Sequence, residues 1–357
     1  MKSSARGALR RYAPLALVGP LIVGVTLRSA HAVTPATAAR WHERADAIVD
    51  ELTNSLSGMR LFVAPATTPA KARADELRRA RPEEARLLDR LAAQPTASWM
   101  GEWSGDVRRA VATITSAAQS SGTVPVLVAY NIPSRDCGEH SAGGERSAEG
   151  YRRWIRDFAD GLGGRKAIVI VEPDGLLLTR CLTPAAEEER FATLRDAVGV
   201  LKSKGATVYL DAGNARWTSP AVAAERLRRA SVDRADGFAL NVSNFIPTDE
   251  SMRFGDRLSA LVKGKHYVID TSRNGAAAPD AQWCNPRGRA LGQLPTTTTG
   301  NALVDAFLWV KVPGESDGTC NGGPRAGQYW VDYALELARN QPARFGGAPR
   351  VASAARR

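Results

Sequence analysis

The chain has 357 residues, of which 44% are hydrophobic and 24% are charged, and its formal net charge is +11. This length and composition suit one large domain or two small ones and exclude global disorder. Five basic residues fall within positions 1–32, and most of the others are interleaved with acids in helical stretches, which excludes a focused nucleic-acid-binding patch.

Residues 1–32 have the pattern of a secretory signal peptide. A basic start precedes the mostly apolar run Ala13–Leu27 and the cleavage site Ala30-His31-Ala32. A membrane anchor is the alternative, but the apolar run is short for a span and is broken by prolines and glycines. We therefore expect a secreted protein with no membrane attachment after cleavage. Arg10-Arg11 leaves the general and the twin-arginine export routes open.

Residues 33–59 form an N-terminal extension with a helical pattern over Ala39–Ser55, and Arg60–Val63 is a candidate strand. Helices are expected over 69–94, with a break near Pro82, and over 104–121. Apolar runs then alternate with helical patterns. The expected strands are 124–131, 167–171, 207–210, 237–242, 267–269 and 306–312, and the expected helices are 148–162, 184–204, 218–230, 249–263 and 326–339.

Strands that alternate with helices indicate parallel pairing. Six or seven such units predict an α/β fold, a closed or nearly closed parallel β/α barrel. We assign residues 60–340 to this domain and 341–357 to a basic tail. The Gly- and Pro-containing segment Ala276–Thr299 is expected to be a long loop, and long loops in compact domains are often functional.

The aliphatic run Ala167–Val171 indicates a strand buried on both faces. It leads into Glu172-Pro173-Asp174-Gly175, where proline and glycine should end the strand. Active sites of barrels lie at the carboxyl ends of the strands, so Asp174 is a candidate catalytic acid. Taken singly, an Asp at a strand end is more often a helix cap or a turn former.

The other predicted strand ends bring further acids and flat rings to the same rim. They are Asp136, Asp211, Asp270, Glu315 and Asp317, with Tyr130, Trp217, Trp283 and Lys311. Rings stack on sugars, and glycosidic cleavage needs a carboxylic acid and a second carboxylate. Each tryptophan alone is more often a core residue. No G-x-S-x-G, P-loop or G-x-G-x-x-G motif is present, so the pattern indicates a secreted hydrolase that acts on carbohydrate.

The four cysteines are Cys137, Cys181, Cys284 and Cys320. They form no CxxC pair, and no histidine is suitably spaced, so the sequence does not indicate a zinc site. After export an even number of cysteines favours disulfides, and four cysteines allow three pairings, of which the sequential pairing closes two short loops.

Seven strings, in order, resemble glycoside hydrolase family 6, the cellulases. They are Tyr130–Cys137, Val171–Leu176, Val208–Asn214, Gly237–Phe245, Val268–Gly275, Trp283–Pro286 and Trp309–Gly318. The resemblance covers most of residues 60–340. It implies that they form a catalytic domain, a distorted seven-stranded parallel β/α barrel of the TIM-like kind. It also implies cleavage of β-1,4-glucan with inversion, without a metal or other cofactor, and two disulfides in the sequential pairing. We expect a monomer.

The resemblance also implies roles for single residues. Asp174 matches the general acid, Asp136 the aspartate that raises the pKa of that acid, and Asp317 the aspartate proposed as base. The matching sugar-binding residues are Tyr130, Asp211, Asn244, Trp99, Trp217, Trp283, Lys311 and Glu315. Arg216 departs from the family because many relatives have a small residue there.

Loop length bears on the mode of action. Chain-end-acting relatives cover the cleft with two long loops, whereas Asp317–Gln328 is short and no long insertion follows Cys137. We therefore expect an open cleft and an endo-β-1,4-glucanase. The alternatives are a chain-end-acting cellobiohydrolase and a non-catalytic glucan-binding protein.

Overall fold

Seven parallel strands form one sheet, in which each strand pairs with the next one along the chain. The computed structural model describes residues 54–64, 68–280 and 282–345. The predicted signal peptide, nearly all of the predicted helix Ala39–Ser55 and most of the basic tail lie outside these residues. The strands are β1 (Ser98–Met100), β2 (Val126–Ala129), β3 (Ile168–Val171), β4 (Thr207–Asp211), β5 (Gly237–Leu240), β6 (His266–Asp270) and β7 (Val304–Leu308).

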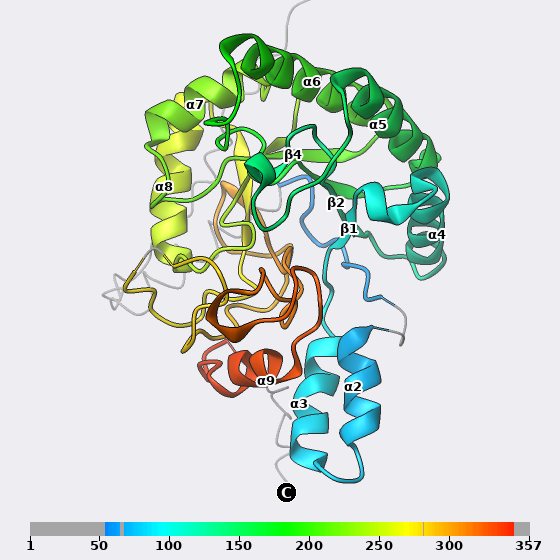
Figure 1. The fold of residues 1–357 in the computed structure, drawn as a ribbon, viewed down its shortest axis with the longest axis vertical. Helices are drawn as coiled ribbons and strands as arrows, with labels where there is room; N and C mark the ends of the chain where they lie inside the picture. Colours follow the sequence, from blue (N-terminus) through cyan, green and yellow to red (C-terminus); the bar gives the residue numbers. More distant parts are fainter. Residues whose placement is uncertain (1–53, 65–67, 281, 346–357) are drawn as a thin grey trace, which may run out of the picture. The chain divides into compact units, whose positions relative to one another are not determined.

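The sheet curls into an incomplete barrel, as Figure 1 shows. β1 and β7 do not pair as strands, but the backbone N–H of Ala97 donates to the carbonyl of Trp309 at 3.0 Å. The indole Nε1 of Trp99 also donates to the carbonyl of Val310 at 2.8 Å. The expected distorted seven-stranded α/β fold is therefore confirmed.

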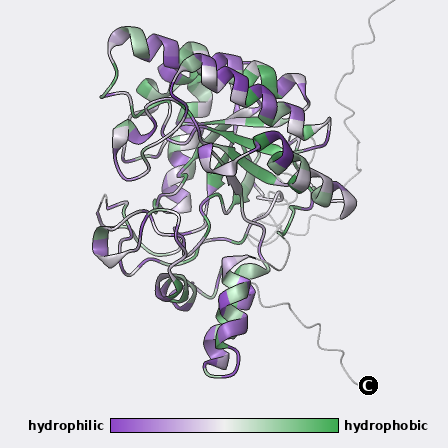
Figure 2. Cartoon of the chain, turned by 45° about the vertical axis from the view of Figure 1, so that its right-hand side comes forward, coloured by the Kyte–Doolittle hydropathy of each residue, from purple (hydrophilic) through white to green (hydrophobic). Residues whose placement is uncertain are grey.

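Strand side chains alternate between two hydrophobic cores. In β3, Ile168 and Ile170 join the core inside the curl, while Val169 and Val171 join the core under the helices. Because successive residues of a strand point to opposite faces, a strand buried on both sides reads as an unbroken apolar run. Figure 2 shows the hydrophobic strands at the centre of the fold, surrounded by helices that carry hydrophilic residues as well.

Five helices, α4 to α8, link the first six strands and cover the outer face of the sheet (Figure 1). Hydroxyl caps start three of them; Ser147 Oγ, for example, accepts from the N–H of Gly150 at 3.1 Å. The described helices are α2 (Pro69–Leu77), α3 (Pro82–Ala92), α4 (Val107–Ser120), α5 (Ala148–Leu162), α6 (Pro184–Ser203), α7 (Pro220–Arg229), α8 (Thr248–Leu261) and α9 (Val331–Arg339), with 3-10 turns η1 (Glu102–Ser104), η2 (Asp136–Gly138) and η3 (Cys320–Gly322).

Several details differ from the sequence-based expectations. The strand expected over 306–312 is β7, which begins earlier and ends at Leu308. The expected strand Arg60–Val63 is only an isolated bridge between Leu61 and Val124. The expected helix over 104–121 begins at Val107, after η1, and the helix expected from 326 begins at Val331, beyond the left-handed Gly327. The sequence did not predict β1, because three residues are too few to show a strand period.

Both disulfides have the sequential pairing, Cys137–Cys181 and Cys284–Cys320. The first ties the segment after β2 to the segment after β3. Within the described ranges, no helix combines the length and the apolar character that crossing a membrane requires.

Candidate active site

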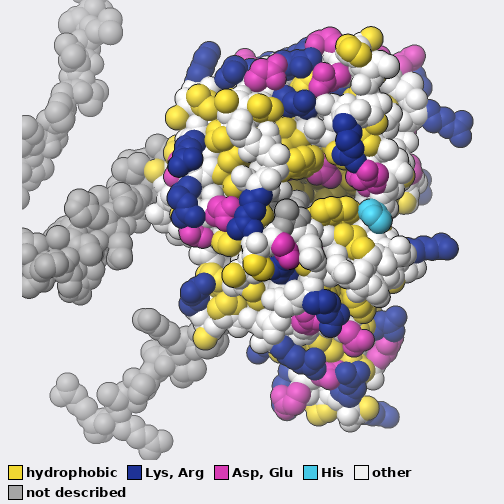
Figure 3. Space-filling view, turned by 60° about the vertical axis from the view of Figure 1, so that its left-hand side comes forward, with side chains coloured by type: hydrophobic (Ala, Val, Ile, Leu, Met, Phe, Trp, Pro, Cys, Tyr) yellow, Lys and Arg dark blue, Asp and Glu magenta, His cyan; other side chains and the backbone are white. Residues whose placement is uncertain are grey.

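The carboxyl ends of the strands open into a cavity of about 1040 Å³. The space-filling view in Figure 3 shows a hollow on one face of the protein with hydrophobic side chains in it. Ten of the predicted site residues line the cavity. They are Trp99, Tyr130, Asp136, Asp174, Trp217, Asn244, Trp283, Lys311, Glu315 and Asp317.

The turn after β3 presents Asp174 to the cavity. Glu172 and Asp174, on either side of Pro173, have left-handed backbone conformations, with φ of 49° and 68°. Such conformations are costly for residues other than glycine and persist where the surroundings enforce them. The N–H of Gly175 closes the turn on the carbonyl of Glu172 at 2.8 Å. The turn therefore redirects the chain so that Asp174 lines the cavity.

Asp174 has the electrostatic surroundings of a proton donor. Burial, and then the negative charges of Asp211 and Asp136, raise its pKa well above the ordinary value of 3.8. A carboxyl group with such a raised pKa keeps its proton at a higher pH than an ordinary aspartate does. It can therefore donate a proton to an oxygen that leaves from carbon.

Asp211 lies behind Asp174 and is not among the cavity-lining residues. Its Oδ2 accepts from the backbone N–H of Asp174 at 2.9 Å, while its Oδ1 is buried and has no hydrogen-bond partner among the described residues. Burial raises the pKa of Asp211 to about 7. The geometry thus places Asp211 where it supports Asp174, whereas the family resemblance had implied contact with the substrate.

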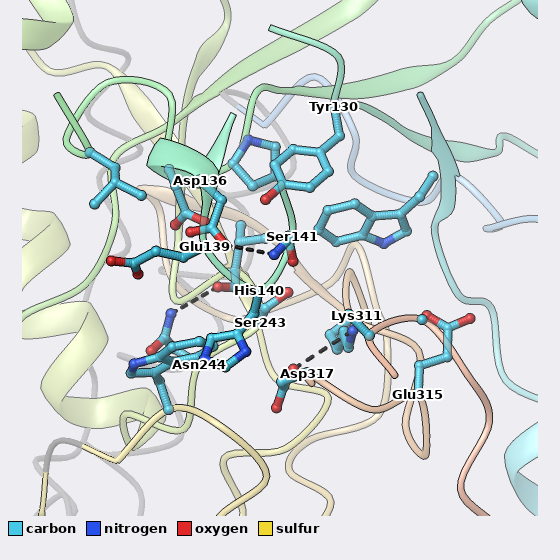
Figure 4. Close-up of a pocket in the computed structure, with 18 of the residues that line it drawn as sticks. Tyr130, Asp136, Glu139, His140, Ser141, Ser243, Asn244, Lys311, Glu315 and Asp317 are labelled. Carbon is cyan, nitrogen blue, oxygen red and sulfur yellow. Dashed lines mark hydrogen bonds and ion pairs between the residues drawn. The ribbon is translucent and has the colours of Figure 1, made fainter. Parts of the chain in front are cut away.

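Asp136 and Tyr130 form the neighbouring wall. Asp136 begins η2, and its Oδ2 accepts from the N–H of Ser141 at 2.7 Å, as the dashed line in Figure 4 shows. Tyr130 is 7% exposed and meets Trp99 edge to face at 5.2 Å. Burial, and then the charges of Asp174 and Asp136, raise the pKa of Tyr130 well above 10.0, so its phenol stays neutral.

Asp317 lies among cations on the opposite wall (Figure 4). Its Oδ2 accepts from Arg273 Nη1 at 2.7 Å and from the N–H of Asn285 at 3.1 Å. Its Oδ1 lies 3.7 Å from Lys311 Nζ and receives no hydrogen bond from the described residues. Burial raises the pKa of the neighbouring Glu315, against the charges of Lys311 and Arg273. One oxygen of Asp317 is therefore fixed, and the other is left for a ligand or water.

Aromatic rings line the cavity from several strand ends. Trp217 is 38% exposed and Trp283 is 43% exposed, while Trp99 is half-buried. The ring of His140 meets Trp283 at 5.4 Å. Exposed indole faces inside a cavity favour flat, partly apolar ligands such as sugar rings.

Two predicted strand-end acids support the backbone instead of lining the cavity. Asp270 accepts from four backbone N–H groups, including those of Lys311 and Ser243 at 3.0 and 2.9 Å. Glu172, to which the sequence had assigned no role, is 1% exposed and accepts from the N–H groups of Asn131 and Ile132 at 3.0 and 3.1 Å. It therefore holds the end of β2 beside the turn that carries Asp174.

Several lining residues were not predicted as site residues. They are Glu102, Trp103, Arg135, Glu139, His140, Arg180, Arg216 and Gln328. Arg216 pairs with Glu250 through two contacts of 2.8 and 2.7 Å and donates to the carbonyl of Ala278. It thus joins the segment after β4 to the long loop. The only feature of the sequence that could have suggested a site role for Trp103 is its position close to Trp99 in the chain.

Metal ligands do not gather in the part of the chain that the structure describes, where no three His, Cys, Asp or Glu side chains converge as a metal-binding group.

Comparison with known proteins gives consistent results. The family model "Glycosyl hydrolases family 6" matches residues 56–341. Endoglucanase A of Cellulomonas fimi is 47% identical over 257 residues, 71% of this chain and 56% of that protein. Endoglucanase 1 of Streptomyces halstedii is 42% identical over 257 residues, 69% of this chain and 79% of that protein. The chain thus matches little more than half the length of the first relative.

A solved structure is also similar. It is the endoglucanase Cel6 from Mycobacterium tuberculosis, in complex with methyl-cellobiosyl-4-deoxy-4-thio-β-D-cellobioside. The TM-score is 0.76 and the sequence identity 47%, and the match covers 80% of this chain and 99% of the other.

Proposed function

Because the chain belongs to glycosyl hydrolases family 6, we propose that it cleaves internal β-1,4-glucosidic bonds of cellulose or a related β-glucan, with inversion at the anomeric carbon. The observation that carries this proposal is the carboxyl group of Asp174, which lines the cavity with its pKa raised well above 3.8 by burial and by two neighbouring acids. Such a group is matched to protonate the glycosidic oxygen of a bound glucan.

In this proposal, Asp136 and Asp317 have different roles in the reaction. Asp136 contributes a negative charge that keeps the proton on Asp174. Asp317 has one oxygen occupied by Arg273 and Asn285, so its Oδ1 is the atom available to accept a proton from the attacking water. An inverting reaction needs this water on the face of the sugar opposite the acid.

The substrate assignment rests on the cavity lining and on the relatives. Trp217 and Trp283 offer exposed rings, while Lys311 and Glu315 offer charged groups for sugar hydroxyls. The curated relatives are named endoglucanases, and the solved Cel6 endoglucanase holds a thio-linked cello-oligosaccharide. Two disulfides are consistent with the secreted location that the sequence predicts. The signal peptide and the monomeric state stay predictions.

Replacement of the acid tests the mechanism. Asp174→Asn should lower turnover of carboxymethylcellulose by at least roughly a hundredfold, because the variant lacks the acid that protonates the leaving oxygen in the proposed mechanism. An aryl cellobioside with a good leaving group should lose much less activity, because it needs little protonation. Asp233→Asn, at an exposed aspartate, is the matched control. Equal losses on both substrates would remove Asp174 from the acid role.

The stereochemical result is independent of that variant. Proton NMR of cellohexaose hydrolysis by the unmodified protein should show the α-anomer as the first product. A β-anomeric first product would contradict the inverting mechanism.

A further inference from the structure

Three tryptophans are strongly exposed in the part of the chain that the structure describes, and all three line the same cavity. Trp103 is 54% exposed, compared with 38% for Trp217 and 43% for Trp283. The other two match sugar-stacking positions, whereas nothing above assigns a role to Trp103. It also belongs to none of the hydrophobic clusters of the fold. A large ring left exposed inside a binding cavity indicates a surface that awaits a ligand.

Local packing fixes the ring of Trp103. The ring lies against Gly101, where a Cβ would come within 2.6 Å of its Cη2 atom. The guanidinium carbon of Arg135 lies 5.0 Å from the ring centroid. Ser104 Oγ accepts from the N–H of Gly101 at 3.1 Å and closes the η1 turn. A ring held in this way loses little conformational freedom when a ligand binds.

A carboxylate stands beside the ring. Glu102 lines the cavity, and 43% of its side chain is exposed. Its two oxygens pair with Arg135 Nη1 and Nη2 at 2.6 and 2.9 Å, which sets the orientation of the carboxylate. A flat ring next to a fixed, exposed carboxylate is suited to a sugar, which presents apolar C–H faces and hydroxyl donors together.

Arg135 also connects the Trp103 ring and the Glu102 carboxylate, together called the platform here, to the wall that carries Tyr130 and Asp136. Arg135 is 4% exposed and precedes Asp136 in the chain. Its Nη1 donates to the carbonyl of Tyr130 and its Nε to the carbonyl of Ser141, both at 2.8 Å. Trp103, in η1, comes soon after Trp99 of β1 in the chain, and both residues line the cavity. The platform is therefore continuous with the wall that carries Tyr130 and Asp136.

We propose that Trp103 and Glu102 form an additional subsite, which binds a glucosyl unit of the β-1,4-glucan chain beyond the unit that lies on Trp99. The proposal rests on the proposed glucanase function. The subsite extends the cavity on the β1 side, away from Trp217, which follows β4. Only chains long enough to reach it gain from the subsite, so it sets a preference for longer glucans.

Calorimetric binding of cello-oligosaccharides tests the subsite without relying on turnover. In an Asp174→Asn background, Trp103→Ala should weaken binding of cellohexaose by roughly tenfold, whereas binding of cellotriose should stay within about twofold. Trp103→Phe keeps a flat ring and should recover most of the cellohexaose affinity. Leu261→Ala, at an exposed aliphatic residue outside the cavity lining, is the control for surface truncation.

The outcomes separate the subsite from the function. Unchanged binding of every oligosaccharide, or an equal loss at all chain lengths, would overturn the subsite. Thermal unfolding of each variant shows whether a loss of affinity comes from misfolding. If Trp103→Ala is misfolded, the affinity of Trp103→Phe for cellohexaose decides whether the subsite exists. Failure of the unmodified protein to hydrolyse any β-glucan would refute the glucanase function instead, while the chain-length pattern of binding would still decide on the subsite.

Discussion

At the scale of single residues, the acids of this protein serve two purposes. Asp174, Asp136 and Asp317 line the cavity, whereas Glu172, Asp211 and Asp270 accept hydrogen bonds from backbone N–H groups behind it. The supporting acids hold turns that carry the lining acids. The sequence motifs include both lining acids and supporting acids, and only the direction of each side chain in the structure distinguishes the two groups.

Glu172 should make folding stability depend on pH. Burial raises its pKa from 4.5 to about 7, so the folded state binds more protons than the unfolded state between these values. The stability that protonated Glu172 confers is present below pH 4.5 and is lost as pH rises toward 7, by roughly 3 kcal/mol. Urea unfolding should therefore show a shallower decline between these pH values for Glu172→Gln than for the unmodified protein.

Exposed Glu189 provides the control, since Glu189→Gln should leave the pH dependence unchanged. Identical slopes for the unmodified protein and Glu172→Gln would show that Glu172 does not hold its proton in the folded state.

At the scale of elements, helices also position the active-site turns. Arg190 of α6 is 5% exposed and reaches two of them. It donates to the carbonyl of Pro133, ahead of Asp136, at 2.5 Å and to the carbonyl of Gly175, after Asp174, at 3.1 Å. One guanidinium thus bridges the turns that carry two of the proposed catalytic acids.

Close packing of α8 on β6 predicts an unusual response to a helix-favouring substitution. A Cβ on Gly255 of α8 would lie 2.5 Å from the ring atom Cε2 of Tyr267. Gly255→Ala should therefore destabilise the protein by about 1–3 kcal/mol, although alanine is the better helix former. Urea unfolding measures the change in free energy.

Gly199 of α6 provides a matched comparison. A Cβ there would meet only the flexible end of Arg234, at 3.0 Å. Gly199→Ala should gain about 0.5–1 kcal/mol from helix propensity. Stabilisation by both substitutions would contradict the packing argument for α8.

At the scale of the whole molecule, the loops around the cavity determine how the proposed glucan substrate would enter. The segments around Cys137 and after Asp317 are short loops with the 3-10 turns η2 and η3. The two segments are in contact where His140 lies against Gly318, and His140 also meets the ring of Trp283. Both loops are short, as expected for an open cleft that allows internal cleavage. The expected internal cleavage agrees with the names of the relatives described above.

Internal cleavage makes a measurable prediction. The viscosity of carboxymethylcellulose should fall steeply while few reducing ends form, because a cut inside a chain shortens it far more than a cut near its end. A slow fall in viscosity per reducing end would favour a chain-end-acting cellobiohydrolase. Binding without any hydrolysis would favour the glucan-binding protein.

By itself, the sequence determined the architecture and the acids of the motifs. The run Ala167–Val171 and its turn predicted β3 and Asp174, because burial on both faces and strand termination leave local signatures. Alternating strands and helices predicted the parallel sheet. The resemblance selected the sequential disulfide pairing, which the structure confirms.

Only the tertiary structure decided what each side chain faces. Asp211 ends the buried strand β4 and Asp174 follows the buried strand β3, yet one lies behind the other because the left-handed turn at Glu172 and Asp174 redirects the chain. Trp103 became a binding candidate only when its ring was found exposed in the cavity. Facing and exposure depend on contacts between residues far apart in the sequence, and local patterns do not encode such contacts.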